Sequence, residues 1–349
     1  MVVIGSSQIG MVDLVKKVIK KVFKTIKFIV VSIVVLLSIF LFVCFINNQI
    51  QLKKEANILV PTGKTVEVNN KNLHVYSEGK GDLTCVFMSG LGIPAPELEF
   101  KALYKNMSDE YRITVVDRAG YGFSDSSNDS RDIDTILDET RKALSLAGEK
   151  SPYVLFPHSI SGLEAIYWAQ KYPEEIKAII GLDIGFPEGY VEQGVKKSDL
   201  LIIKLQALLT KSGVHRLLPS LVFDKTILES NFLSEDEKEL YKALTYKNLL
   251  SKDAIREFSA LEANSNKSLA LELPTKTPLC IFLAVPLTEE ERIQRSTFFE
   301  QRNKYYNDYV SQFENGKIIS APGKHSIYLY SPENIAKESK NFLKSISNE

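Results

Sequence analysis

Cysteine, histidine and tryptophan are scarce in this sequence, whose 349 residues include three, four and one of them respectively. Three cysteines do not build a disulfide framework, and the spacing of Cys44, Cys85 and Cys280 fits neither a zinc site nor a redox pair. Cys85 and Cys280 fall in apolar runs, where cysteine packs as a small hydrophobic residue. The sequence also lacks a phosphate-binding glycine loop. We therefore expect neither a metal nor an organic cofactor.

Net charge is also absent, because 43 basic side chains balance 43 acidic ones. The balance is uneven along the chain: residues 1–27 contain six lysines against the single acid Asp13, a local net charge of +5. The rest of the chain therefore carries about −5 and offers no basic footprint for nucleic acid. The basic block at the N-terminus needs a different explanation.

Charge disappears completely from residues 28–46, whose sequence is FIVVSIVVLLSIFLFVCFI. A helix of this length reaches roughly 28 Å, close to the hydrocarbon thickness of a bilayer. A cleaved signal peptide has a shorter apolar run that ends in small residues, whereas this run ends in Cys44-Phe45-Ile46. We therefore predict an uncleaved transmembrane helix over residues 28–46.

The lysines on either side of this run predict its orientation. Six precede it, whereas Lys53 and Lys54 follow it beside Glu55. By the positive-inside rule, residues 1–27 form a cytoplasmic segment. We expect a polar linker over residues 47–63 and then an extracytoplasmic domain, which makes the chain a single-pass protein of the cell membrane.

Residues 64–349 alternate short β-branched runs with amphipathic helices, a pattern typical of a mostly parallel sheet flanked by helices. The alternation stops between about residues 187 and 274, where the pattern is helical throughout. We interpret this insertion between two strands as a helical lid over the strand ends. The pattern predicts strands at Lys64–Val68, Leu73–Ser77, Cys85–Met88, Ile113–Val116, Tyr153–Phe156, Ile176–Leu182, Leu279–Val285 and Lys317–Ser320.

The strongest chemical signal follows the strand Tyr153–Phe156, where residues 157–162, PHSISG, lead directly into a helical pattern. A serine among small residues at a strand-to-helix turn is typical of a nucleophile elbow. The turn strains the backbone of the serine and places its hydroxyl at the positive end of the following helix. Ser159 is therefore the predicted nucleophile.

Four histidines are available as the general base. His74 lies in a predicted strand, and His215 lies in the predicted lid. His158 directly precedes Ser159, so its side chain should point away from the hydroxyl. His325 remains, in a loop between the last strand and the last helix, and it is the predicted base.

Three further stretches resemble the α/β-hydrolase family. Residues 88–92, MSGLG, follow a strand where that family has a His-Gly oxyanion loop. Residues 117–124, DRAGYGFS, look like its Asp-Arg-x-Gly-x-Gly-x-Ser loop, and residues 323–325, GKH, lie where it places its catalytic histidine. The resemblance covers residues 64–346 apart from the lid, and it implies an α/β-hydrolase fold.

The chain departs from the family pattern in three places. Pro157 and Ser161 replace the glycines usual in the elbow, and Ser89 replaces the histidine usual in the oxyanion loop. The last change matters less where the donors are backbone amides. By resemblance, the oxyanion hole consists of the backbone N–H groups of Leu91 and Ile160.

The sequence leaves the acid of the triad open. Family members usually carry it after the strand that corresponds to Leu279–Val285, which is followed here by Glu289–Glu291 and no aspartate. Some members, including haloalkane dehalogenases, carry it on the preceding strand, which here ends at Asp183. The resemblance favours Asp183 as the acid. The group Glu289–Glu291 and the lack of any acid partner remain alternatives.

These residues predict a membrane-anchored serine hydrolase that cleaves a carboxylic ester or an amide through an acyl-enzyme on Ser159, with His325 as base. The expected substrate is a small-molecule or lipid-like ester. A serine nucleophile argues against dehalogenase and epoxide-hydrolase chemistry, for which the family uses aspartate. A proline iminopeptidase-like peptidase is the nearest alternative, although its elbow reads Gly-Ser-Trp-Gly. A catalytically inactive binding module is an alternative from another class.

Overall fold

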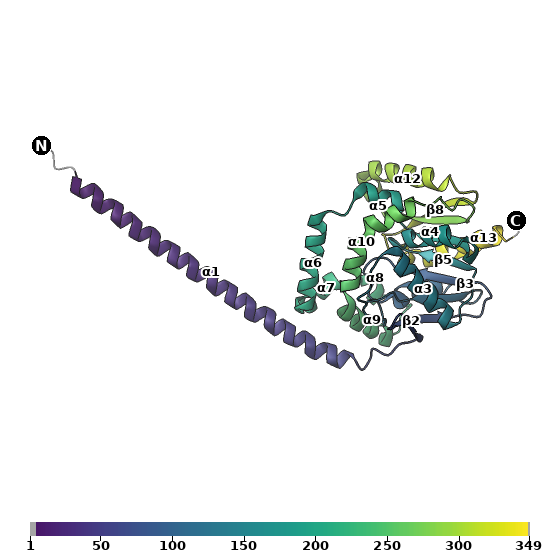
Figure 1. The fold of residues 1–349 in the computed structure, drawn as a ribbon, viewed down its shortest axis with the longest axis horizontal. Helices are drawn as coiled ribbons and strands as arrows, with labels where there is room; N and C mark the ends of the chain where they lie inside the picture. Colours follow the sequence, from purple (N-terminus) through teal and green to yellow (C-terminus); the bar gives the residue numbers. More distant parts are fainter. Residues whose placement is uncertain (1–4, 348–349) are drawn as a thin grey trace.

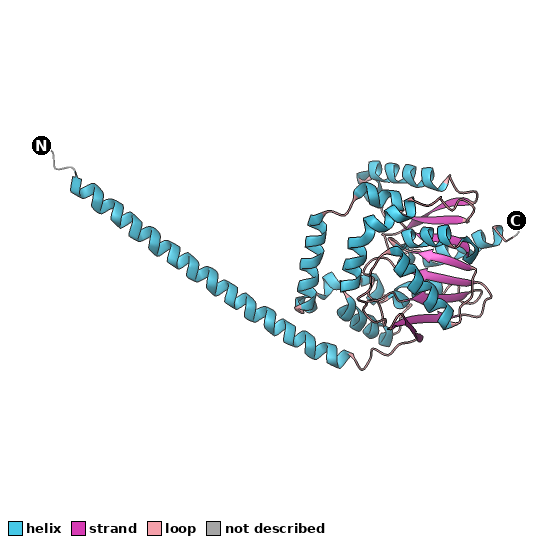
Figure 2. Cartoon of the chain, viewed as in Figure 1, coloured by secondary structure: helices cyan, strands magenta, loops and turns pink. Residues whose placement is uncertain are grey.

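A computed structural model describes residues 5–347, in which eight strands form one sheet with helices on both faces and a long helix outside it (Figures 1 and 2). The strand order is β1-β2-β4-β3-β5-β6-β7-β8. β2 is antiparallel to both β1 and β4, and all other neighbours are parallel. The strands are β1 Lys64–Val68, β2 Lys71–Glu78, β3 Thr84–Met88, β4 Arg112–Val116, β5 Tyr153–Pro157, β6 Ile176–Leu182, β7 Leu279–Val285 and β8 Gly316–Pro322.

The predicted mostly parallel sheet is confirmed, and every predicted strand coincides with an observed one to within a few residues. The opening hairpin shows why its turn is readable from sequence. β1 and β2 are joined by Asn69 and Asn70, whose φ angles are 50° and 59°. Two successive positive φ angles are what a two-residue hairpin turn of type I′ requires, and asparagine tolerates them well.

Helices cover both faces of the sheet and bury an apolar core on each side. α2 (Pro96–Tyr104) and α13 (Pro332–Ser345) pack on one face. α3 (Ile133–Ala147), α4 (Ser161–Lys171) and α12 (Ser296–Val310) pack on the other. The sheet is therefore a buried scaffold, and the loops at the carboxyl ends of its parallel strands are free to carry chemistry.

Two helical features differ from the pattern in the sequence. The spacing predicts one helix over residues 290–313, but the structure has α11 (Glu289–Gln294) and α12, separated at Arg295. Arg295 has φ −115° and ψ 20°, which interrupts the helical backbone. α2 was not predicted, because its nine residues are buried on nearly every side and show no amphipathic period.

Between β6 and β7 the chain forms a set of helices that we call the lid. They lie on the side of the domain that faces the long N-terminal helix (Figure 1). This is the segment, about residues 187–274, for which a lid was predicted. The lid helices are α5 Pro187–Gln193, α6 Lys197–Lys211, η2 Val214–Leu217, α7 Pro219–Val222, α8 Lys225–Leu228, α9 Glu235–Asn248 and α10 Lys252–Leu269.

The long helix, α1 (Gly5–Glu55), contains the predicted membrane span and is long and apolar enough to cross a bilayer. α1 continues past Ile46 to Glu55. Residues 47–55, about the first half of the predicted linker over residues 47–63, are therefore helical. The extension is stabilised by Arg216 of the lid, which donates hydrogen bonds to Asn48 and Glu55. Residues 1–4 of the predicted cytoplasmic segment lie outside the described residues.

Candidate active site

Ser159 occupies the turn between β5 and α4. Its φ of +57° lies in the left-handed region, which is strained for a residue that has a side chain. α4 begins at Ser161, so Ser159 lies at the positive end of that helix. Gly162 allows the close approach of the helix, because a Cβ at this position would lie 2.6 Å from the carbonyl oxygen of Gly185. The turn therefore has the backbone geometry of a nucleophile elbow.

The two unusual residues of the elbow fit the turn in different ways. Pro157 ends β5 and pairs with Met88 of β3, while the pairing of β5 with β6 is interrupted after Leu155 and resumes as a single bridge between His158 and Leu182. Pro157, which has no N–H, therefore lies in the gap of the β5–β6 ladder at the end of its strand, a position where proline is tolerated. The Ser161 hydroxyl accepts a hydrogen bond from the His158 N–H and lies 2.8 Å from the carbonyl oxygens of Met88 and His158, to either of which it donates. Ser161 therefore ties the turn to β3.

Asp183 and His325 meet beyond the ends of β6 and β8. The Oδ2 atom of Asp183 lies 2.8 Å from Nδ1 of His325. The other carboxylate oxygen accepts a hydrogen bond of 2.9 Å from the Ala284 N–H and lies 3.7 Å from Nη1 of Arg302. Asp183 is buried, with a φ of +50°. Its carboxylate is thus held in one orientation from several sides.

The alternative acids have partners other than His325. Glu289–Glu291 form the first turn of α11, where Thr288 caps the helix. Glu289 pairs with Arg292 and Glu291 pairs with Arg295, each at 3.5 Å. Of the acids considered from the sequence, Asp183 is the one whose carboxylate contacts the imidazole of His325.

The imidazole of His325 borders a pocket of about 390 Å³. The side chain of His325 is 58% exposed, so the ring edge away from Asp183 is accessible. The pocket walls are both apolar and basic, and they include Pro286, Phe298, Phe299, Arg295 and Arg302. A group that leaves or enters beside His325 has room here.

His158 lies beneath His325, with the two ring centroids 4.7 Å apart. Its Nε2 is 3.2 Å from the carbonyl oxygen of His325. Burial, and then the nearby His325 ring, lower the pKa of His158 to about 3, so this imidazole stays neutral at physiological pH. This contact is not predictable from the sequence, because His158 and His325 are far apart along the chain.

The other two histidines have partners of their own. His74 in β2 is buried, and its Nδ1 lies 2.8 Å from Oδ2 of Asp117. His215 in the lid is buried against the ring of Tyr246, 5.3 Å between centroids. Their placement leaves His325 as the histidine that combines an exposed ring with a carboxylate partner.

The predicted oxyanion loop lies against the elbow. A Cβ on Gly90 would lie 3.1 Å from the Cβ of Ser159 and 2.8 Å from Nδ1 of His158, so glycine is needed at this contact. The backbone N–H groups of Leu91 and Ile160 donate no hydrogen bond to any group within residues 5–347. Both are therefore free donors near Ser159.

Two residues of the DRAGYGFS stretch hold the oxyanion loop from behind. The Nη2 atom of Arg118 donates to the Gly90 carbonyl at 3.2 Å. The Tyr121 hydroxyl accepts from the Gly92 N–H at 3.1 Å and donates to Glu257 of α10 at 2.7 Å. The motif in the sequence marked Arg118 and Tyr121, but nothing in the sequence identified their partner on the lid.

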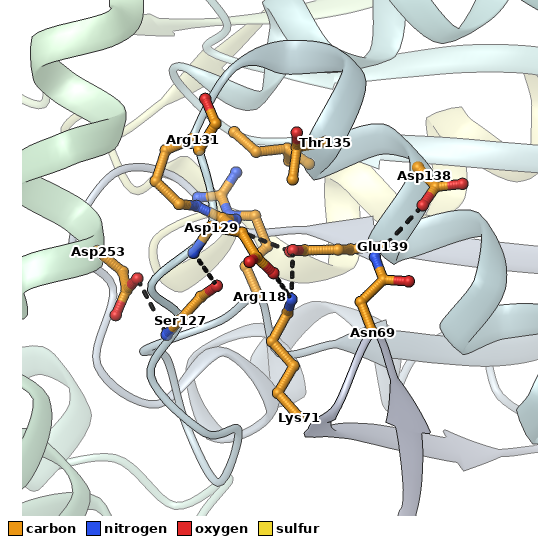
Figure 3. A network of polar contacts seen from close by, with 12 residues as sticks. Asn69, Lys71, Arg118, Ser127, Asp129, Arg131, Thr135, Asp138, Glu139 and Asp253 are labelled. Carbon is orange, nitrogen blue, oxygen red and sulfur yellow. Dashed lines mark hydrogen bonds and ion pairs between the residues drawn. The ribbon is translucent and has the colours of Figure 1, made fainter.

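Arg118 belongs to a buried chain of ion pairs that runs toward the edge of the sheet. Lys71 pairs with Glu139 at 2.8 Å, and Glu139 pairs with Arg131 at 2.8 Å. Arg131 and Arg118 both approach Glu257, at 3.3 and 3.5 Å. Figure 3 shows Lys71 and Glu139 pointing toward each other. Buried charges are costly unless paired, so this network fixes Arg118 and through it the oxyanion loop.

Glu99 of α2 is a buried acid behind the candidate site. It accepts a hydrogen bond of 3.3 Å from Tyr328, whose ring packs edge-on against His158. Burial, and then the Asp224 carboxylate, raise the pKa of Glu99 to about 8. A raised pKa means that its contribution to stability is fully present below the unfolded pKa near 4.5 and is lost as pH rises through about 8.

We expect Glu99→Gln to flatten this pH dependence, because glutamine stays uncharged. The parent should lose about 1.4 kcal/mol of stability per pH unit from this group as pH rises between the two pKa values. The variant should exceed the parent in melting temperature above pH 8. Thermal unfolding of the detergent-solubilised chain from pH 5 to 9 measures this, with Glu239→Gln on an exposed face of α9 as control. Parallel curves for parent and Glu99→Gln would contradict it.

Comparison with known proteins agrees with the fold described above. The model of the family described as the alpha/beta hydrolase fold matches residues 90–201, which include the elbow and Asp183. Over 327 residues the chain is also 44% identical to the protein YbdG of Bacillus subtilis (strain 168), covering 94% of this chain and 99% of that protein. The chain belongs to the α/β-hydrolase fold family.

Solved structures show the same fold over most of this α/β-hydrolase. An epoxide hydrolase from Vigna radiata superposes with a TM-score of 0.58 at 19% identity, covering 81% of this chain and 97% of its own. A loop variant of a haloalkane dehalogenase from Bradyrhizobium elkanii superposes with a TM-score of 0.54 at 14% identity, covering 82% and 97%. At these identities the likeness concerns the fold and not the reaction.

Metal-binding side chains are not grouped in the part of this α/β-hydrolase that the structure describes. Among residues 5–347 there is no cluster of three or more His, Cys, Asp or Glu side chains that would hold an ion. Cys44, Cys85 and Cys280 are free and buried.

Proposed function

We propose that this α/β-hydrolase cleaves carboxylic esters through an acyl-enzyme on Ser159. The observation that carries the proposal is the contact of 2.8 Å between Asp183 and Nδ1 of His325, in a domain whose elbow holds Ser159 at a φ of +57°. A carboxylate at Nδ1 keeps the ring proton there, so Nε2 is left as the base. A serine nucleophile needs such a base to accept its proton.

In the first half of the reaction, the Ser159 Oγ attacks the ester carbonyl carbon while Nε2 of His325 accepts the hydroxyl proton. The carbonyl oxygen becomes negative and accepts hydrogen bonds from the N–H groups of Leu91 and Ile160. The ester C–O bond then breaks, and the imidazolium protonates the departing alkoxide. The acyl group is left on Ser159, and the alcohol leaves.

In the second half, water attacks the acyl carbon and gives its proton to Nε2 of His325. The same two backbone amides stabilise the second tetrahedral intermediate. Its collapse breaks the bond to Ser159 Oγ, which recovers the proton from His325. The carboxylic acid leaves, and the enzyme returns to its starting state. Asp183 stabilises the imidazolium in both halves.

Several observations favour an esterase over the other candidates. The nucleophile position holds serine, which acts on esters or amides and not on alkyl halides or epoxides. The elbow reads His-Ser-Ile-Ser and not Gly-Ser-Trp-Gly, which favours an ester hydrolase over a proline iminopeptidase-like peptidase. The contact between Asp183 and His325 argues against a catalytically inactive binding module.

We propose in addition that α1 anchors the enzyme in the cell membrane, with residues 1–27 in the cytoplasm and the hydrolase domain outside it. The apolar run over residues 28–46 and the six lysines before it support this topology. A tethered enzyme meets substrates at the membrane surface, so the proposed substrates are small-molecule or lipid-like esters.

Labelling with a fluorophosphonate probe tests the proposed nucleophile. The probe reacts with an activated serine, so the full chain in detergent should be labelled and Ser159→Ala should not. His325→Ala should also lose labelling, because the base is missing. Ser145→Ala is the matched control, since Ser145 is an exposed serine on α3 and not part of the elbow, and its labelling should equal that of the parent.

A folded parent that does not react with the probe would overturn the esterase proposal and favour the binding module. Retained labelling in Ser159→Ala would instead show that another serine is the nucleophile. Far-ultraviolet circular dichroism of each variant shows whether a loss of labelling reflects a loss of fold.

A further inference from the structure

The lid carries an apolar surface that the other described parts of the chain leave uncovered. Five apolar side chains on α6 are 48–64% exposed, and three more between Leu217 and Leu221 are 47–80% exposed. Exposed apolar groups gathered in this way mark an interaction surface on a protein. We call these residues the lid apolar face: Leu201, Ile202, Leu205, Leu208, Leu209, Leu217, Leu218 and Leu221.

The residues on α6 form one stripe of that helix. Their spacing of i, i+1, i+4, i+7 and i+8 places them along a single side, while Ala207 faces the domain and is buried. Lys204 and Lys211 are exposed and lie next to the stripe. An apolar stripe bordered by lysines is typical of a helix that lies in the surface of an anionic membrane.

The lid apolar face adjoins the helix that is proposed to cross the membrane. Gly213, directly after α6, packs against α1 so closely that a Cβ there would lie 2.5 Å from the Cys44 carbonyl oxygen. Arg216 binds both carboxylate oxygens of Glu55, at 2.6 and 2.7 Å, and Asn48 at 2.6 Å. Figure 1 shows α6 and α7 on the side of the domain that faces α1. The lid is thus fixed to the end of the anchor.

The contact at Cys44 sets the height of the lid relative to the membrane. Cys44 belongs to the apolar run that ends at Ile46, so it lies about 3 Å inside the end of that run. The C-terminal end of α6 therefore lies level with the edge of the hydrocarbon layer. The side chains of α6 that face away from the domain are then at the depth where apolar groups contact acyl chains and lysines reach the phosphates.

We propose that the lid apolar face is embedded in the lipid surface on the hydrolase side of the membrane, so that the enzyme has two membrane contacts, α1 and α6. The occupant of this face is lipid: acyl chains against the leucines, and anionic headgroups beside Lys204 and Lys211. The inference rests on the proposed membrane attachment of α1. It makes the lid a membrane-binding element and not a cover open to water on its outer side.

Depth-dependent fluorescence quenching tests this inference. A cysteine replaces Leu208 in the full chain and carries an environment-sensitive fluorophore, while the three native cysteines are buried. The chain is reconstituted in vesicles of phosphatidylethanolamine and phosphatidylglycerol that contain nitroxide lipids. Leu36→Cys on α1 and Leu146→Cys on α3 carry the same label as reference sites. Their exposure matches that of the test site: Leu208 is 64% exposed, Leu36 66% and Leu146 59%.

We expect the label at position 208 to be quenched most by nitroxides near the headgroup, and the label at position 36 by nitroxides deep in the acyl chains. The label at position 146 should be quenched by neither. Quenching at position 36 without quenching at position 208 would overturn this inference and leave the membrane anchor intact. No quenching at position 36 would overturn the anchor and this inference together. Blue-shifted emission at position 208 without quenching would place the face against protein, such as a second copy, and would also overturn it.

Discussion

Replacing Ser159 with alanine is expected to lower kcat for ester hydrolysis by roughly a millionfold, because removal of the nucleophile abolishes the acyl-enzyme route altogether. The substitution removes one oxygen atom at a position that is partly exposed, so the fold should be retained. KM should change little, since the pocket beside His325 is untouched. A residual rate above that of water is expected from the free N–H groups of Leu91 and Ile160.

The measurement is release of p-nitrophenol from esters of increasing acyl length, with the full chain in detergent micelles. Ser145→Ala serves as the control and should match the parent. If Ser159→Ala keeps a kcat within tenfold of the parent, the elbow does not carry the nucleophile. In that case the strained φ of Ser159 would need a purely structural explanation.

Asp183→Asn is the second substitution with a large expected effect, a loss of roughly 10⁴-fold in kcat. Asparagine keeps an oxygen for the Ala284 N–H, but its amide can donate to Nδ1 of His325. The ring proton would then move to Nε2, and the base would be lost even though the geometry is retained. KM and the melting temperature should change much less than kcat.

Glu291→Gln is the matched control, because Glu291 borders the same pocket without contacting the imidazole. Its kcat should stay close to that of the parent. A loss in Glu291→Gln as large as that in Asp183→Asn would return the acid to α11 and would require a rearrangement of the loop after β7. Equal activity of all three proteins would mean that His325 works without a carboxylate partner.

The strands and the elbow were predictable because their signals are local. A buried parallel strand is recognised as a short apolar run. The turns at Asn69-Asn70 and at the PHSISG stretch are each determined by the few residues that form them. The acid of the triad was less predictable, since the distance from Asp183 to His325 depends on the order in which β6, β7 and β8 pair in the sheet. The sequence predicts only that Asp183 lies at the end of a strand. The order of the strands in the sheet determines that this end lies beside the imidazole of His325.

Other features were not predictable from the sequence because they also depend on contacts between distant residues. The contact between His158 and His325, and the pairing of Tyr121 with Glu257, join residues that are more than a hundred positions apart. The extension of α1 to Glu55 contacts Arg216 of the lid, a partner that the sequence around Ile46 does not indicate. The polar residues 47–63 predict a linker, and the structure shows that the first part of this segment continues α1 to Glu55.

The exposed edge of the His325 ring affects which acceptor removes the acyl group from Ser159 in the proposed reaction. With 58% of this side chain exposed, solvent reaches the base without passing through a channel. In the proposed reaction, an acyl-enzyme at such a site would partition among the acceptors that reach it, in proportion to their local concentration and reactivity. Water outnumbers every dissolved alcohol or amine there. The partition therefore favours hydrolysis over transfer to a second substrate, unless an acceptor is held in the pocket between His325 and α12.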